Sequence, residues 1–336
     1  MSADEDILAA KTGITGTGIK IIALVTMLID HFAGIILDNY LEYKVPGYSD
    51  SNVAIDFSAF LVDGYAGIFA LSTLLHLIGR FAFPLFIFLL IEGFVHTRSV
   101  KKYALNMLIF AAISQLPYNV VHEGRLFYFN TLNIFTTLLM GLLCMWCISE
   151  LAEKKKWSDK LTFLYYISSI LLGAYILWLL TKTTNIEAFK NMSLISMLIM
   201  CGVGAVIGLI VMLIVGRNFD SDTKNRFTFT VLPIIVIGVI SYYIRVEYSV
   251  YGVMTIVVMY LLRDRSTTGF GLSVLMLNIY NLLELTAFFM IPVVSRYNGV
   301  RGMKINKYFF YLFYPVHLSI LYIITLMLGW TTFSIM

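Results

Sequence analysis

The chain consists largely of apolar runs long enough to cross a membrane, separated by short polar segments. A transmembrane helix needs about 20 mostly apolar residues, because the hydrocarbon core is about 30 Å thick and a helix rises about 1.5 Å per residue. We therefore predict an all-α protein, a polytopic membrane helix bundle of about ten transmembrane helices with re-entrant or broken segments. The predicted spans are 18–37, 66–96, 103–121, 131–151, 161–181, 193–215, 228–244, 248–262, 269–291 and 307–329.

The tract 66–96 is too long for a single straight span, since as one helix it would reach roughly 45 Å. It contains Gly79 and Pro84, which are typical of breaks in membrane helices. We therefore expect a short re-entrant or interfacial piece up to about residue 79, followed by a true span.

Composition agrees with a membrane protein. Hydrophobic residues make up 59% of the 336 residues and charged residues 13%, with a mean hydropathy of +0.84, whereas a soluble domain carries about 25% charged residues. The lipid bilayer is therefore the expected solvent for one transmembrane domain that covers residues 1–336. The net charge is only +4, with lysine and arginine in short loops, so we expect no nucleic-acid partner.

The distribution of charge predicts the orientation, because short cytoplasmic loops are enriched in lysine and arginine. Basic loops near 98–102, 154–156 and 217–226 are expected in the cytoplasm, together with a short N-terminal tail, 1–16. We therefore expect a multi-pass protein of a cell membrane with its N-terminus in the cytoplasm. The loop 38–65 is expected outside, where its acidic residues are Asp38, Glu42, Asp50, Asp56 and Asp63. The basic residues of 292–306 (Arg296, Arg301 and Lys304) also fall outside by this count, unless the helices before them are miscounted.

Two pairs of small residues have simple interpretations. Cys144 and Cys147 form a C-x-x-C pair inside an apolar run, but no histidine or second pair accompanies them, so we expect neither a redox role nor a metal site. Gly204 and Gly208 are spaced for close helix packing. Packing within the chain is the first interpretation, and a homodimer is the alternative.

The stretch LIDHFAGIILDNY, residues 28–40, places an acid and a histidine inside an apolar run. Ionisable residues in the bilayer are costly and usually face the bundle interior, where they serve function. Lys20 and His31 are eleven residues apart, about three turns, and so share a helix face. Asp30 points about 100° away and needs a partner on another helix. Structural packing of the pair is the alternative interpretation.

Further polar residues recur in other spans. Arg80, Glu92 and His96 lie in one tract, with Glu92 and His96 on one face at i, i+4 and Arg80 at the expected outer end. The remaining candidates are Gln115, Asn119, Asn133, Tyr314 and His317. We predict that these five line a substrate site; hydrogen bonding between helices is the alternative.

Together these residues are typical of general-base chemistry. Histidine has an unperturbed pKa near 6.5 and can take a proton from an amine or hydroxyl near neutral pH. We predict His31 as the base, with Asp30 or Glu92 tuning it and Arg80 stabilising oxyanion charge. No zinc motif, nucleophile elbow or phosphate-binding glycine loop is found in the sequence.

Four stretches resemble the TraX family: TGTGIKIIALVTMLIDH, GRFAFPLFIFLLIEGFVHTR, KKYALNMLIFAAISQLPYN and YFFYLFYPVHL. The founding role of that family is N-terminal acetylation of conjugative F-pilin. The spacing from Lys20 to His31 is also similar to a motif of the type 3 family of integral-membrane acyltransferases.

The resemblance implies an acetyltransferase that uses cytoplasmic acetyl-CoA and no metal. The acceptor would be an amine or hydroxyl of an extracytoplasmic or membrane-bound molecule, such as a pilin-like N-terminus or a glycan. His31 would act as general base or as transient acyl carrier. Acyl-CoA would meet basic residues at the cytoplasmic end: Lys20, His96, Arg98, Lys101 and Lys102.

Two other classes of function explain part of the pattern. Intramembrane Asp, Glu and His are also typical of a proton-coupled transporter or flippase. A structural protein of an envelope assembly would use the amides to hold helices together. Acyl-CoA binding distinguishes the enzyme from both.

Overall fold

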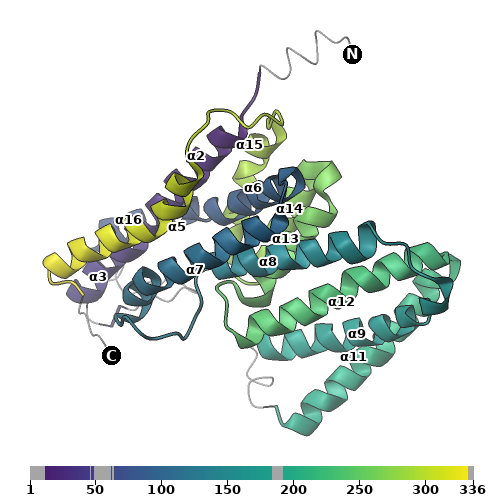
Figure 1. Ribbon diagram of the computed structural model, residues 1–336. Helices are drawn as coiled ribbons and strands as arrows, with labels where there is room; N and C mark the ends of the chain where they lie inside the picture. The colour runs from purple at the N-terminus through teal and green to yellow at the C-terminus, as the bar shows by residue number, and fades with distance from the viewer. Residues whose placement is uncertain (1–11, 46, 49–61, 63, 184–191, 332–336) are drawn as a thin grey trace. The chain divides into compact units, whose positions relative to one another are not determined.

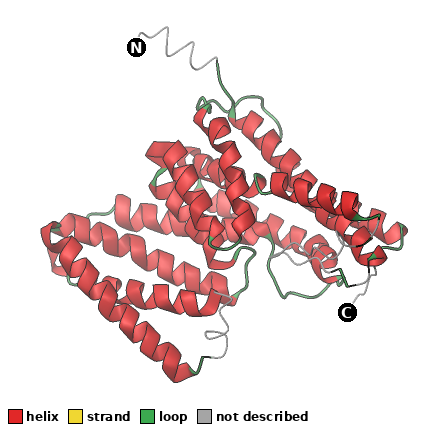
Figure 2. Ribbon diagram, turned by 180° about the vertical axis from the view of Figure 1, so that it is seen from behind, coloured by secondary structure: helices red, strands yellow, loops and turns green. Residues whose placement is uncertain are grey.

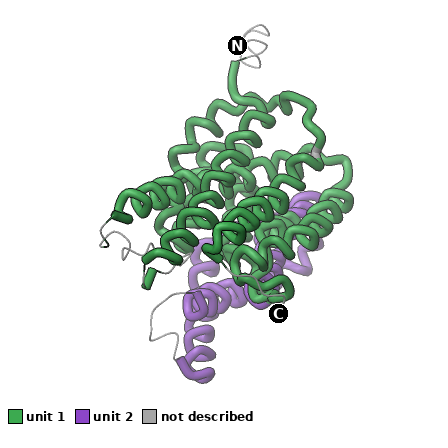
Figure 3. Tube along the Cα trace, turned by 90° about the vertical axis from the view of Figure 1, so that its left-hand side faces the viewer, with its two compact units in different colours: residues 1–142, 244–336 green, residues 143–243 purple. Residues whose placement is uncertain are grey.

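The computed structural model describes residues 12–45, 47–48, 62, 64–183 and 192–331. These residues form an all-helical protein, as the sequence predicted (Figures 1 and 2). Two compact units are distinguished, unit 1 with residues 1–142 and 244–336 and unit 2 with residues 143–243 (Figure 3). Eight described helical segments are long and apolar enough to cross a membrane, and two shorter apolar segments accompany them.

Unit 1 holds the helices that carry most of the candidate residues. They are α2 (Gly16–Phe32), the π-helical η1 (Ala33–Asp38), α3 (Asn39–Lys44), α5 (Ala66–Gly79), α6 (Ala82–His96), α7 (Val100–Glu123), the first part of α8 (Ile134–Ile148), α13 (Ser249–Leu261), α14 (Ser266–Asn278), the 3₁₀ segment η6 (Leu282–Met290), α15 (Ile291–Ser295) and α16 (Lys307–Met327). Helix α2 begins at Gly16 because the hydroxyl of Thr15 accepts a hydrogen bond from Gly18 N–H. Helices α5 and α6 both pack along α2.

The prediction of one span over 269–291 is wrong. The chain reverses after α14, so that Phe288 and Ile291 lie beside Gly271. Asn281 caps η6 through its side chain, which accepts from Leu283 N–H, and this local alternative to the helix ladder ends the run. The run therefore forms two shorter antiparallel segments in place of one span.

This reversal explains the basic segment that did not fit the orientation rule. Backbone hydrogen bonds join Gly16 N to Val300 O at 2.8 Å and Thr17 N to Arg301 O at 2.9 Å. The segment 292–306 therefore lies at the same end of unit 1 as the start of α2, not at the opposite end. Its basic residues therefore lie at the same end as the basic residues of 98–102, which follow α6, and both segments fit the rule that such residues gather on one side of the membrane.

Two further expectations need correction. The tract 66–96 breaks at Arg80–Phe81, between α5 and α6, but Arg80 lies at this internal junction instead of at an outer end. Asp38 belongs to η1 and is buried at 2% exposure, so it is not a loop residue. The other acids of that loop, apart from the exposed Glu42, lie outside the described residues.

Unit 2 comprises η2 (Ser149–Glu153), η3 (Asp159–Leu161), α9 (Leu164–Thr183), α11 (Leu194–Val215), η4 (Gly216–Asn218) and α12 (Ser221–Tyr243), with the last part of α8. Helix α11 packs on α9 through Gly204 and Gly208, which face Gly173. These two glycines are therefore used within the chain, as first interpreted. The opposite face of α11 is apolar and exposed, which suits contact with lipid.

We expect Gly173→Ala to destabilise unit 2 by about 1–3 kcal/mol, since an added methyl would overlap the backbone of Gly204. Gly202→Ala is the matched control, because a Cβ there meets nothing within 4 Å. Thermal unfolding in detergent should show a lower midpoint for the first variant only. Equal midpoints for both variants would contradict this packing.

Candidate functional site

Helix α2 carries the histidine that the sequence singled out, and α16 supplies its partner. His31 Nδ1 lies 2.6 Å from His317 Nε2, and His317 Nδ1 lies 2.6 Å from the carbonyl oxygen of Phe313. A carbonyl only accepts, so the proton of a neutral His317 is on Nδ1 and its Nε2 accepts from His31 Nδ1–H. The other ring nitrogen of His31, Nε2, then carries a lone pair.

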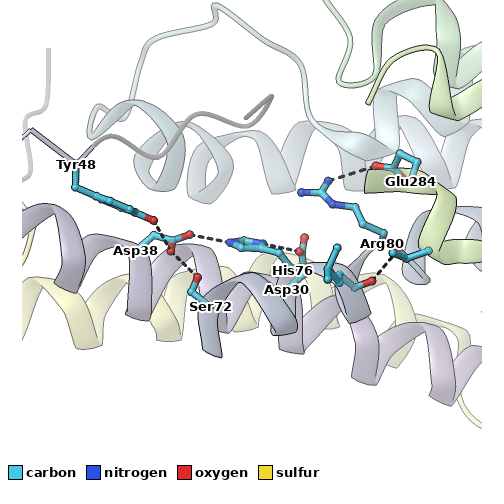
Figure 4. Close-up of polar contacts among 9 residues, drawn as sticks. Asp30, Asp38, Tyr48, Ser72, His76, Arg80 and Glu284 are labelled. Atoms are coloured by element: carbon cyan, nitrogen blue, oxygen red, sulfur yellow. Dashed lines mark hydrogen bonds and ion pairs between the residues drawn. The ribbon is translucent and has the colours of Figure 1, made fainter. Parts of the chain in front are cut away.

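Asp30 has a partner on another helix, as the sequence analysis required. His76, on α5, donates from Nδ1 to Asp30 Oδ1 at 2.9 Å and from Nε2 to Asp38 Oδ2 at 2.7 Å. Figure 4 shows the imidazole ring lying between the two carboxylates. Ser72 and Tyr48 donate to Asp38 Oδ1 at 2.6 and 3.0 Å. Both carboxylate oxygens of Asp38 are therefore hydrogen-bonded. A quarter of the Asp30 side chain is accessible.

Arg80 lies beside this group, at the junction of α5 and α6. Its Nη1 donates to Glu284 Oε1 at 3.3 Å, and Glu284 is fully buried (Figure 4). Asp30 also attracts Arg80 electrostatically. The junction is fixed in addition by Thr286, whose hydroxyl donates to Leu77 O at 2.9 Å.

The sequence analysis missed His76, His122 and Glu247. His122 and His76 both interact electrostatically with His31, so four of the five histidines of the chain belong to this centre. Glu247 interacts with Asp30 and Arg80. His76 carries the same signal as His31, an ionisable group inside an apolar run, and could have been found by that rule; Glu247 lies in a turn between helices and gave no such signal.

The turn that brings Glu247 to the centre has an unusual backbone. Arg245, Tyr248 and Ser249 have φ values of 54°, 60° and 49°, a left-handed conformation that is uncommon for residues with side chains. The turn is held by hydrogen bonds from Glu247 N–H to Leu132 O at 2.8 Å and from the hydroxyl of Thr137 to Glu247 O. The ring of Tyr248 stacks on Phe83 with centroids 4.2 Å apart.

The structure does not bring Glu92 to His31. Glu92 lies ten positions after Ala82, the first residue of α6, which corresponds to about 15 Å of helix rise away from the junction that holds Arg80. Its carboxylate instead accepts a hydrogen bond from the hydroxyl of Tyr297 at 2.9 Å. His96 lies 3.6 Å from Glu92 and is largely exposed. Burial and the Glu92 carboxylate raise the pKa of the Tyr297 phenol above its usual range. Glu92 and His96 thus belong to the end of unit 1 where α2 begins.

That end also holds the other four residues expected to meet acyl-CoA. Lys20 is half-buried, with Nζ 5.1 Å from the ring centroid of Phe310, and Arg301 lies close enough to repel it. Arg98, Lys101 and Lys102 are exposed around the start of α7.

The predicted amides form one network. Gln115 Nε2 donates to Asn119 Oδ1 at 2.7 Å, and Asn133 Nδ2 donates to Gln115 Oε1 at 2.8 Å. Asn133 also donates to Ala111 O at 2.7 Å. The network joins α7 to the start of α8. A role in binding substrate stays a prediction, as it does for Tyr314, whose ring centroid lies 5.8 Å from that of His31.

The arrangement suits proton-transfer chemistry with organic groups. Among the described residues, no group of three histidine, cysteine or acidic side chains is placed to hold a metal ion. The centre combines imidazoles, carboxylates and one guanidinium, which are the groups that general acid–base catalysis uses.

Comparison with known proteins gives two matches. A family model described as TraX protein matches residues 15–216 and 205–325. A protein described as "Probable fimbrial assembly protein FimC, serogroup H1", from Dichelobacter nodosus, is 33% identical over 78 residues. That match covers 21% of this chain and 32% of the relative, so it spans about a third of the relative's length. No solved structure matches.

Proposed function

Because the chain belongs to the TraX protein family, we propose that it is a membrane-embedded acetyltransferase. It takes the acetyl group from acetyl-CoA and transfers it to an amine of a membrane-bound or extracytoplasmic acceptor. The fimbrial relative favours an acceptor from a pilus or fimbria, such as the N-terminus of a pilin-like subunit. The family model covers most of the chain, so the proposal concerns the whole helix bundle.

The observation that carries the proposal is the hydrogen-bond chain from Phe313 O through His317 to His31. It sets the tautomer of His31 so that Nε2 is free to take a proton. In many group-transfer enzymes the acceptor is activated by a base, and a third group holds that base in the right orientation. Here His317 positions the base, and His31 is the group that touches the acceptor.

The reaction uses this base once per turnover. His31 Nε2 takes a proton from the acceptor nitrogen, the nitrogen attacks the thioester carbonyl, and the carbon–sulfur bond breaks. The proton held by His31 then passes to the thiolate of CoA. Arg80 supplies positive charge near the developing oxyanion.

Unsatisfied acidic groups favour an amine over a hydroxyl acceptor. Glu247 Oε2 and Glu284 Oε2 are buried without a hydrogen-bond partner in the part of the chain that the structure describes. Buried carboxylate oxygens are stabilised by a cation or donor, and an ammonium group provides both. A neutral hydroxyl would supply one donor and no charge.

Acyl-CoA would enter at the end of unit 1 where α2 begins. The nucleotide phosphates would bind among Lys20, Arg98, Lys101 and Lys102. Arg301, which lies near Lys20, would join them. Phosphates pair well with such groups. With the N-terminus in the cytoplasm, this end faces the cytoplasmic pool of acetyl-CoA.

The test is turnover by the purified protein. In detergent or liposomes with radiolabelled acetyl-CoA and a peptide with a free N-terminus, we expect release of CoA thiol and label on the peptide. Absence of acetyl-CoA binding and turnover by folded protein would contradict the proposal. Solute flux without turnover would indicate a transporter instead.

We expect Lys20→Gln to raise the KM for acetyl-CoA about tenfold, the effect of losing about 1.4 kcal/mol of binding, with a smaller change in kcat. Lys44→Gln is the matched control. It also removes one positive charge from the same span, but from an exposed side chain near the opposite end. Steady-state kinetics over a range of acetyl-CoA concentrations measures both values. Equal KM values for the two variants would exclude Lys20 from the donor site.

A further inference from the structure

His76 is bonded at both ring nitrogens, and its two partners lie at different depths. Asp30 and Asp38 are eight residues apart along α2 and η1, which corresponds to about 12 Å of helix rise. The ring bridges them through contacts of 2.9 and 2.7 Å (Figure 4). Imidazole is the side chain that accepts a proton at one nitrogen while releasing one from the other.

Beyond Asp38 the chain of hydrogen bonds continues away from the start of α2. Tyr48 donates its hydroxyl proton to Asp38 Oδ1. Tyr48 follows the end of α3 at Lys44, where the first long helical segment ends. The line from Asp30 through His76 and Asp38 to Tyr48 therefore runs from the centre of unit 1 toward its end opposite the donor entry.

Acetylation of an ammonium group leaves a proton to be removed. The nitrogen of R–NH₃⁺ carries three protons and that of the amide product carries one, so two are released. One leaves with CoA as its thiol, and the other must leave a centre that apolar helices surround. The His31–His317 pair ends at a backbone carbonyl, which cannot carry a proton onward.

We propose that Asp30, His76 and Asp38 form the exit path for this second proton, an inference that rests on the acetyl transfer proposed above. Asp30 accepts the proton. His76, which carries a proton on each ring nitrogen, gives the one on Nε2 to Asp38, turns the bare nitrogen to Asp30 and takes the new proton there. Asp38 releases its proton toward the outer end once the Tyr48 hydroxyl has turned from donor to acceptor. The imidazole loses one proton and gains one, and so returns to its doubly protonated form.

The surrounding charges suit such a path. His76 is faced by Asp30 on α2 and Asp38 on η1, with His31 in electrostatic range. Arg80 interacts with Asp30 and is itself held by Glu284 of η6. Asp30 thus has a cation on each side, and its accessible quarter is where a proton would arrive.

The test measures the rate of acetyl transfer by the full-length protein in liposomes. Acetyl-CoA is supplied at the donor end, and a small molecule, imidazole or pyrazole, is added to the opposite solution. We expect His76→Ala to slow transfer by roughly 10²-fold, the low end of acid–base contributions. Added imidazole should restore the rate in proportion to its concentration, while pyrazole, of similar size but a much weaker base, should not. Leu74→Ala, on an exposed side of α5, is the control that keeps the wild-type rate.

A second variant covers the case in which His76→Ala does not fold. His76→Gln keeps a polar side chain of similar size but cannot relay a proton, so we expect it to fold and to turn over slowly. A wild-type rate for His76→Gln would overturn the path, as would a slow His76→Ala variant that imidazole does not restore. Failure of the wild-type protein to release CoA would instead overturn the acetyltransferase proposal, and the path with it.

Discussion

Replacing His31 by alanine should lower the rate of acetyl transfer by roughly 10²–10⁴-fold, the contribution of a positioned general base. The variant loses the only nitrogen that the Phe313–His317 chain prepares to take a proton. Binding of acetyl-CoA should be nearly unchanged, because the basic residues at the entry remain. Initial rates with radiolabelled acetyl-CoA, together with equilibrium binding of the donor, measure the two effects separately.

The control for this variant is Leu28→Ala, three residues earlier on α2, where the side chain is exposed. It should keep the wild-type rate. His317→Ala should fall between the two, because the imidazole of His31 remains but its tautomer is no longer fixed. Full activity in His31→Ala would assign the base to another group, and Asp30, with its accessible carboxylate, would be tested next.

The helical fold could be predicted because the bilayer limits the choices. Without water to pair backbone groups, an apolar run of spanning length must be a helix, and the positions of most runs were correct. The exception was 269–291, where hydropathy alone does not distinguish one span from two shorter antiparallel segments. The capping side chain of Asn281 was the local signal, and the misplaced charges of 292–306 were the global one.

The candidate site was predicted in part. The free-energy cost of burying an ionisable group in the bilayer singled out Asp30 and Arg80, which the structure brings together, and it required a partner for Asp30. It did not name His76, because that partner is 46 residues away in the sequence and pairing across helices leaves no mark on spacing. Glu92 was grouped with His31 because both are ionisable, although its depth along α6 sets it apart.

The second large effect concerns the stability of the bundle. Glu284 is fully buried and Arg80 is largely buried, and they form an ion pair at 3.3 Å. Arg80→Ala leaves Glu284 as an uncompensated buried charge, so this variant should lower the free energy of unfolding by about 3–5 kcal/mol. Thermal unfolding in detergent, followed by helical circular dichroism, should show the loss. Glu284→Ala should lower the stability less, because Asp30 still attracts Arg80.

The double variant Arg80→Met/Glu284→Leu distinguishes this ion pair from simple loss of packing. Replacing both charges by apolar side chains of similar volume removes the desolvation cost as well as the attraction, so stability should return close to that of the wild type. The same variant should stay inactive, because Arg80 is gone from the centre. A double variant as unstable as either single variant would mean that shape at the α5–α6 junction, and not the charge pair, holds η6 against α5. Recovery of stability without activity would show that the sequence keeps this buried pair for chemistry, at a site where an apolar pair would hold the helices equally well.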